Sequence, residues 1–120
     1  MTRWALVTLL ALVVLGVVTV AMARFFGKSG SRASVVVSIA AHWLAAYVLW
    51  SFAGGLAVTT GLISAYHNAP FAAIAVLGAL WQYQTHLRWG RERALAFFVS
   101  VQLAWLLWVL SQNGMFLRGW

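Results

Sequence analysis

The sequence predicts an all-α integral membrane protein, a bundle of four transmembrane helices joined by short loops. The 120-residue chain is 64% hydrophobic and 8% charged, and a soluble domain of this size cannot bury so much apolar surface. The charged residues lie at the ends of long apolar runs, and a helix needs roughly 20 apolar residues to cross a bilayer. We therefore expect a single transmembrane domain over residues 1–120.

The apolar runs place the expected helices at about residues 4–26, 33–53, 70–87 and 93–111. The connection between the first two is the segment GKSGSR at residues 27–32. A short polar turn of this kind suits an antiparallel pair of helices.

The second helix is expected to end near the glycine pair at 54 and 55. Residues 54–69 carry no charge and are rich in Gly and Thr, so we expect a short extension of that helix followed by an interfacial, partly re-entrant loop. Pro70 marks the start of the third helix, because proline fits the first turn, where its missing N–H has no helical partner. The segment RWGRER at 88–93 is a tight basic turn into the fourth helix.

The distribution of basic residues predicts the topology. Loops 27–32 and 88–93 and their flanks hold most of the Lys and Arg, whereas residues 54–69 hold none. By the positive-inside rule both basic loops are cytoplasmic and both termini lie outside. The net charge of +7 is then a topology signal, and we expect no nucleic-acid partner. The excess of Arg over Lys and the abundant Ala are typical of a GC-rich bacterium, so we expect a bacterial inner membrane.

Aromatic residues are expected to gather at the two membrane interfaces. The outer group is Trp4, Trp50, Tyr66, Trp108 and Trp120, and the inner group is Phe25, Phe26 and Trp89. Three tryptophans lie nearer the interior of their helices and are expected to pack between helices or against a lipid or cofactor: Trp43, Trp81 and Trp105.

Polar residues inside the helices form the candidate site. By the helical rise, His42 and Gln102 lie ~13 Å from the cytoplasmic ends of their helices, and Gln82 and Tyr83 lie roughly 6 to 9 Å from theirs. Ser38 belongs to the same layer. Polar groups facing lipid are unfavourable, so we expect these five to point inward, with Gln102 the nearest partner for His42. They either bridge helices or surround a cofactor.

His42 is the candidate ligand. Ser38 precedes it by four residues and Ala45 and Ala46 follow it, leaving a flat recess beside an imidazole that can ligate haem iron or chlorophyll magnesium. The stretch from Ser38 to Trp50 resembles the histidine region of bacterial light-harvesting antenna helices, where a small residue lies four before the ligand and aromatics follow. This resemblance implies a pigment or haem at His42, although the flanking chain is unlike those single-span polypeptides.

A second group is expected to meet lipid headgroups at the cytoplasmic border: His86, Arg88, Trp89 and Arg91. No metal site is expected, because the three histidines lie at three depths, Glu92 is the only acidic residue, and there is no cysteine.

The chemistry that is missing limits the function. A coupled transporter usually carries a buried acid, and the apolar runs contain none. A hydrolase needs a nucleophile beside a base, and the sequence shows no such combination. We therefore expect neither a coupled transporter nor an enzyme. Two classes remain. The favoured one is an accessory or scaffold subunit of a larger respiratory or photosynthetic complex, with other membrane subunits and lipids as partners and a haem, chlorophyll or quinone as candidate cofactor. The alternative is a small homo-oligomeric uncoupled channel or carrier.

Overall fold

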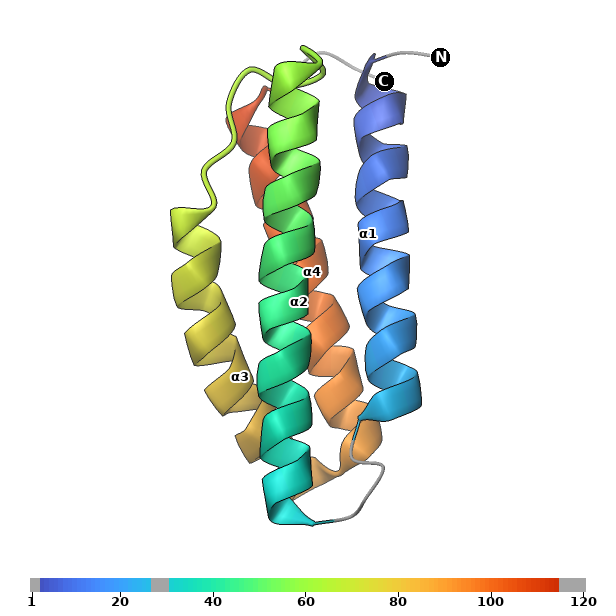
Figure 1. The fold of residues 1–120 in the computed structure, drawn as a ribbon, viewed down its shortest axis with the longest axis vertical. Coiled ribbons are helices and arrows are strands. Elements are labelled where there is room, and N and C mark those ends of the chain that lie inside the picture. The colour runs from blue at the N-terminus through green and yellow to red at the C-terminus, as the bar shows by residue number, and fades with distance from the viewer. Residues whose placement is uncertain (1–2, 27–30, 115–120) are drawn as a thin grey trace.

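The computed structural model describes residues 3–26 and 31–114. The described residues fold into four α-helices, α1 (Arg3–Phe25), α2 (Arg32–Thr59), α3 (Ala69–Trp89) and α4 (Arg91–Gln112). Successive helices run in opposite directions and pack in a ring, so that α1 and α3 both contact α2 and α4 but lie across a diagonal from each other (Figure 1). The expected all-α architecture of four helices is confirmed.

Three of the four helices, α1, α2 and α4, are long and apolar enough to cross a membrane. The prediction of four such helices is therefore supported for three. α3 is 21 residues long, but the second half of its sequence, WQYQTHLRW, mixes amide, hydroxyl, imidazole and guanidinium groups with its apolar residues.

Helix boundaries agree with the predicted ones within two residues except at the end of α2. The apolar run is predicted to end at about residue 53 with a short helical extension beyond it, and α2 does continue through both glycines, six residues further, to Thr59. The predicted loop over 54–69 is therefore shorter, at residues 60–68. Glycine at 54 is compatible with the helix, and it leaves room for the ring of Tyr66 on the helix surface. The helix ends where Gly61 takes a φ of 77°, a conformation that glycine adopts without strain.

Caps fix the other helix ends. The Ser31 side chain accepts a hydrogen bond from the backbone N–H of Ser34 at 3.1 Å and so starts α2. Pro70 lies in the first turn of α3, as predicted. Gly90, with a φ of 93°, lies between α3 and α4 and lets the chain reverse in a single residue.

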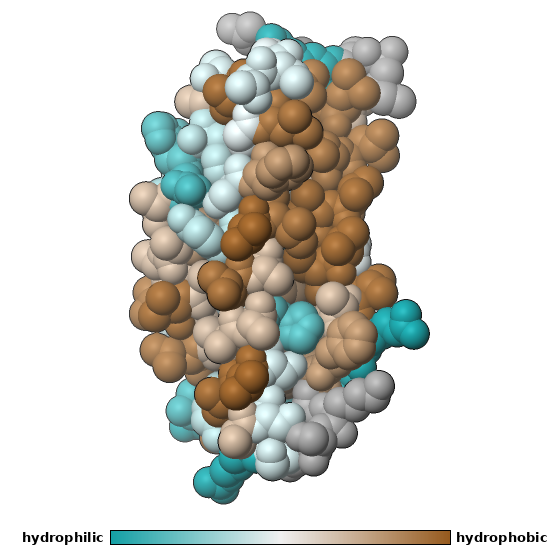
Figure 2. All heavy atoms as spheres, in the orientation of Figure 1, coloured by the Kyte–Doolittle hydropathy of each residue, from teal (hydrophilic) through white to brown (hydrophobic). Residues whose placement is uncertain are grey.

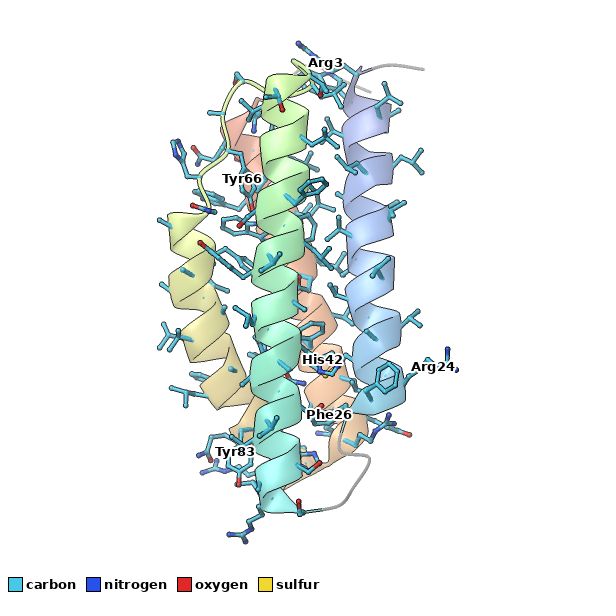
Figure 3. The ribbon with its side chains drawn as sticks, in the orientation of Figure 1. Arg3, Arg24, Phe26, His42, Tyr66 and Tyr83 are labelled. Carbon is cyan, nitrogen blue, oxygen red and sulfur yellow. The ribbon has the colours of Figure 1, made fainter. Side chains whose placement is uncertain are left out.

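The described arginines divide the bundle into two ends. Five of them lie at or beside the α1–α2 and α3–α4 connections, which we call the basic end: Arg24, Arg32, Arg88, Arg91 and Arg93. Arg3 lies at the opposite end, where residues 60–68 connect α2 to α3 (Figures 1 and 3). Lys28, Arg118 and Trp120, and most of the predicted loop 27–32, lie outside the described residues.

The burial of several aromatic residues differs from the prediction. Trp50 and Phe26, predicted at interfaces, are 4% and 1% exposed and pack inside the bundle. Trp81, predicted to pack between helices or against a lipid or cofactor, is 67% exposed and so does not pack between helices. Trp43 and Trp105 are buried between helices, as predicted. These helices are apolar on every side, so polarity alone does not tell which tryptophan faces inward.

The outer surface is largely apolar. Figure 2 shows hydrophobic side chains over most of the face formed by α1 and α2, with hydrophilic ones gathered at the two ends and over the connection between α2 and α3. Large hydrophobic side chains stand exposed on all four helices, including Val17, Phe52, Leu77 and Leu107. A soluble monomer rarely exposes apolar surface of this extent.

Candidate functional site

In the half of the bundle nearer the basic end, its axis is filled by one side chain from each helix, which we call the central layer: Met22, Trp43, Gln82 and Phe98. Each is at most 1% exposed. The indole N–H of Trp43 donates to Oε1 of Gln82 at 2.6 Å, and the rings of Trp43 and Phe98 meet edge to face at 5.0 Å. The Gln82 amide nitrogen lies 3.8 Å from the Met22 sulfur. The four side chains therefore pack against one another at this level.

Gly78 makes this layer possible. The Trp43 ring lies directly on the backbone of α3, and a Cβ built at residue 78 would be 2.6 Å from Cη2 of the indole. Real atoms do not approach so closely, so only glycine admits the ring at this point. Trp43 can then reach Gln82 one turn further along the same helix.

A second tryptophan–glutamine pair lies closer to the opposite end. The indole N–H of Trp50 donates to Oε1 of Gln102, so that α2 and α4 are linked across the bundle diagonal. Both side chains are buried, and the Gln102 amide nitrogen has no hydrogen-bond partner among residues 3–26 and 31–114. Sequence reasoning missed Trp50 here. The signal was its spacing, because Trp43 and Trp50 are seven residues apart and thus share one helix face.

His42 lies between α2 and α1 (Figure 3) and is half-buried. Its Nδ1 is 2.6 Å from the backbone oxygen of Ser38, and the Ser38 hydroxyl, 3.4 Å from the same nitrogen, donates to the Phe25 carbonyl at the end of α1. A carbonyl only accepts, so Nδ1 carries the imidazole proton. In the neutral form of this ring the lone pair is then on Nε2.

The expected pair of His42 with Gln102 does not form, because Gln102 accepts from Trp50 instead. The depth estimate assumed that all helices begin at one level. In the structure α2 extends further toward the basic end than its neighbours (Figure 1). Side chains at equal distances from their own helix ends therefore lie at different levels.

The five predicted cofactor residues do not form one site. Gln82 belongs to the central layer and Gln102 to the second tryptophan pair, while His42 and Ser38 lie on the side facing α1. Tyr83 is on the other side of α2, in a shallow apolar groove between α2 and α3. A second hollow between the same two helices shares three lining residues with this groove: Ala40, Val76 and Ala79.

The four residues predicted to meet headgroups divide into two pairs. The His86 ring meets the edge of buried Phe26 at 5.2 Å, and Arg91 donates from Nε to the Phe26 carbonyl at 3.3 Å and from Nη2 to the Ala23 carbonyl. A guanidinium there satisfies free carbonyls and the negative end of the α1 dipole. Arg88 and Trp89, by contrast, are exposed.

The connection between α2 and α3 is held by a residue that sequence reasoning did not single out. Oδ1 of Asn113, after the end of α4, accepts from the backbone N–H groups of Ser64 and Ala65 at 3.0 and 3.2 Å. Its Nδ2 donates to the Ala65 carbonyl at 3.2 Å. The connection is thereby fixed with the Tyr66 ring against Gly54 and 6.0 Å from the Trp105 ring.

Burial raises the pKa of Tyr66 from 10.0 to about 12, with Trp105 acting in the opposite direction and Tyr47 adding to the rise. The folded state thus keeps this proton after the unfolded chain has lost it. The contribution of Tyr66 to the free energy of unfolding is expected to be complete below pH 10 and to be lost between pH 10 and 12. Unfolding titrations should show a smaller alkaline loss in Tyr66→Phe. An equal loss in both proteins would contradict the assignment.

Comparison with known proteins gives no match: no family model, no curated protein and no solved structure is significantly similar to the chain. The function must therefore be argued from the residues and their geometry.

Proposed function

We propose that this chain is a non-catalytic integral membrane subunit of a larger bacterial complex, respiratory or photosynthetic, with its basic end in the cytoplasm. Three helices have the length and apolarity for insertion, and five arginines at one end agree with the positive-inside rule. α3 crosses with them, because it is packed between α2 and α4.

The closed central layer is the observation that carries this proposal. Gln82 and Gln102, the fully buried polar side chains of the described bundle, are both used to hold tryptophans. The oxygens of both amides are therefore engaged within the bundle, and the packed rings of Trp43 and Phe98 oppose a path for ions. The chain therefore acts through its apolar outer faces, on which other subunits and lipids pack.

The alternative, an uncoupled channel or carrier, is less well supported by the same geometry. A pore through one bundle would have to open the layer of Trp43, Gln82 and Phe98. A pore between several copies would need polar side chains along one outer face, and the exposed faces of α1 and α2 are predominantly apolar over their length.

His42 is the proposed contact with a cofactor. In ligating histidines the ring nitrogen that does not bind the metal typically donates to a carbonyl, which fixes the tautomer and the ring orientation. His42 has this arrangement through Ser38, and small, exposed Ala41 and Ala45 lie beside it. A haem or chlorophyll on this face would be ligated by Nε2 and covered from the other side by a partner subunit.

Purification from the native membrane in mild detergent tests both parts. We expect an assembly heavier than a simple multiple of this chain on native mass spectrometry, with a haem or chlorophyll band in its absorption spectrum. His42→Leu should remove the band and leave the chain inserted, whereas His67→Leu, at an exposed histidine of the connection, should not. A colourless homo-oligomer would overturn the subunit proposal, and a spectrum unchanged by His42→Leu would overturn the ligand assignment.

A further inference from the structure

A hollow lies on the outer side of α3 at the basic end. Five side chains from the last three turns of the helix line it: Trp81, Gln84, Thr85, Arg88 and Trp89. The two indoles, 67% and 61% exposed, form its walls, and the space between the side chains amounts to about 460 Å³. The Thr85 hydroxyl donates to the Trp81 carbonyl at 2.9 Å, which leaves the Gln84 amide, the Arg88 guanidinium and the two indole N–H groups open to a ligand.

The hollow carries positive charge that no described side chain neutralises. Arg88 makes no hydrogen bond or ion pair in the part of the chain that the structure describes. The Arg93 guanidinium lies over the Trp89 ring at 5.0 Å from its centroid, so a second arginine is next to the wall of the hollow that Arg88 also lines. Glu92, the single acidic residue of the sequence, lies within 4.0 Å of none of the described basic groups.

This arrangement differs from that of Arg91 at the same end. The Arg91 guanidinium is engaged by two α1 carbonyls, so it has a structural role within the bundle. Arg88 and Arg93 have no such role, and their charges face outward beside an exposed indole. An anion is the partner that this geometry lacks.

The residues that line the hollow are spread along α3, in the direction in which a lipid would lie beside a helix that crosses the membrane. Trp81 and Trp89 are eight residues apart, ~12 Å by the helical rise. Arg88 is at the charged border, where a phosphate would lie, and the Gln84 amide is one turn deeper, level with the ester carbonyls of a glycerolipid. Beyond Trp81 the exposed side chains are the apolar Leu77 and Leu80, which suit acyl chains. Indoles are favoured at this boundary, where one side is apolar and the other wet.

We propose that this hollow binds an anionic phospholipid, with the headgroup phosphate between Arg88 and Arg93 and the glycerol backbone between the two indoles. The site rests on the proposed insertion of the bundle in a membrane but is independent of any cofactor at His42. Of the four residues predicted to meet headgroups, Arg88 and Trp89 belong to this site and His86 and Arg91 do not. The site adds Trp81 and Gln84, which were not in the predicted group.

Lipid retention by the purified full chain tests the site. Native mass spectrometry after titration with phosphatidylglycerol or phosphatidylcholine of the same acyl chains should show preferential retention of phosphatidylglycerol. Arg88→Gln should weaken that retention about fivefold, the effect expected of one arginine near a charged lipid surface. Arg24→Gln is the matched control, since it removes the same charge from an exposed position of α1 at the same end and should leave retention unchanged.

The remaining outcomes separate the site from its alternatives. Equal weakening by Arg88→Gln and Arg24→Gln would show diffuse charge attraction and overturn the site. Equal retention of the two lipids would overturn the anionic headgroup, and displacement by millimolar inorganic phosphate would overturn the lipid as occupant. If the chain stays in solution without detergent, the proposed membrane insertion fails. A chain that needs detergent but retains no phosphatidylglycerol contradicts this site alone.

Discussion

Replacing Gly78 with alanine is expected to lower the free energy of unfolding by about 1 to 3 kcal/mol, the usual cost of overpacking a dense core. The new Cβ would lie 2.6 Å from the Trp43 indole, and that ring cannot move away, because it is 1% exposed and hydrogen-bonded to Gln82. Reversible unfolding of the detergent-solubilised protein by titration with a denaturing detergent would measure the change.

Gly16→Ala is the matched control for this substitution. It makes the same chemical change inside α1, where a Cβ would meet nothing within 4 Å. Alanine is the better helix former by roughly 0.5 to 1 kcal/mol, so this variant should be as stable as the parent or slightly more so. A similar loss in both variants would show that the cost comes from the helix backbone and not from the contact with Trp43.

Gln82→Leu is expected to cost about 1 to 3 kcal/mol, because it leaves the indole N–H of Trp43 buried without an acceptor. The reverse change, Trp43→Phe, leaves the Gln82 oxygen without its donor. When both are changed together, neither unpaired group remains. The double variant should therefore lose less stability than the sum of the two single losses, and the difference measures the coupling of the pair.

The control for this cycle is Gln84→Leu, two residues along α3. Gln84 is exposed, so this substitution should change stability little while altering the same residue type. Additive losses for Trp43 and Gln82 in the double variant would contradict the hydrogen bond between them. A loss in Gln84→Leu as large as in Gln82→Leu would contradict the assignment of Gln82 to the closed interior.

Helix type, number and most boundaries could be predicted from the sequence, because charges, Pro70 and the basic segments interrupt long apolar runs. The end of α2 could not. A glycine pair usually indicates a break in a helix. Gly54 is nevertheless helical, and the absence of a Cβ leaves space for the ring of Tyr66. That ring belongs to the connection and is twelve residues further along the chain. Only the tertiary contact shows why a side chain is missing there.

The sequence also did not show which face of each helix points into the bundle. Trp50 and Trp81 are both tryptophans in apolar surroundings, yet one is buried and the other is exposed. In a helix without a polar face the rotation is decided by shape, and the informative residues are the small ones that admit a ring, such as Gly78. The partner of His42 was mispredicted for a related reason, since the stagger of α2 against α4 is not encoded in either helix alone.

The modest apolarity of α3 has a consequence for how the chain is made. Among the described helices, α1, α2 and α4 each contain a segment apolar enough to cross a membrane, and α3 is not one of these candidate spans. In the proposed membrane topology, insertion by the translocon depends on that property. The amide of α3 at Gln82 finds its partner on α2, which has already been synthesised, and the remaining flank of α3 is covered by α4, which has not. We therefore expect α3 to wait beside α2 in the translocon and to enter the lipid together with α4, as a hairpin hinged at Gly90.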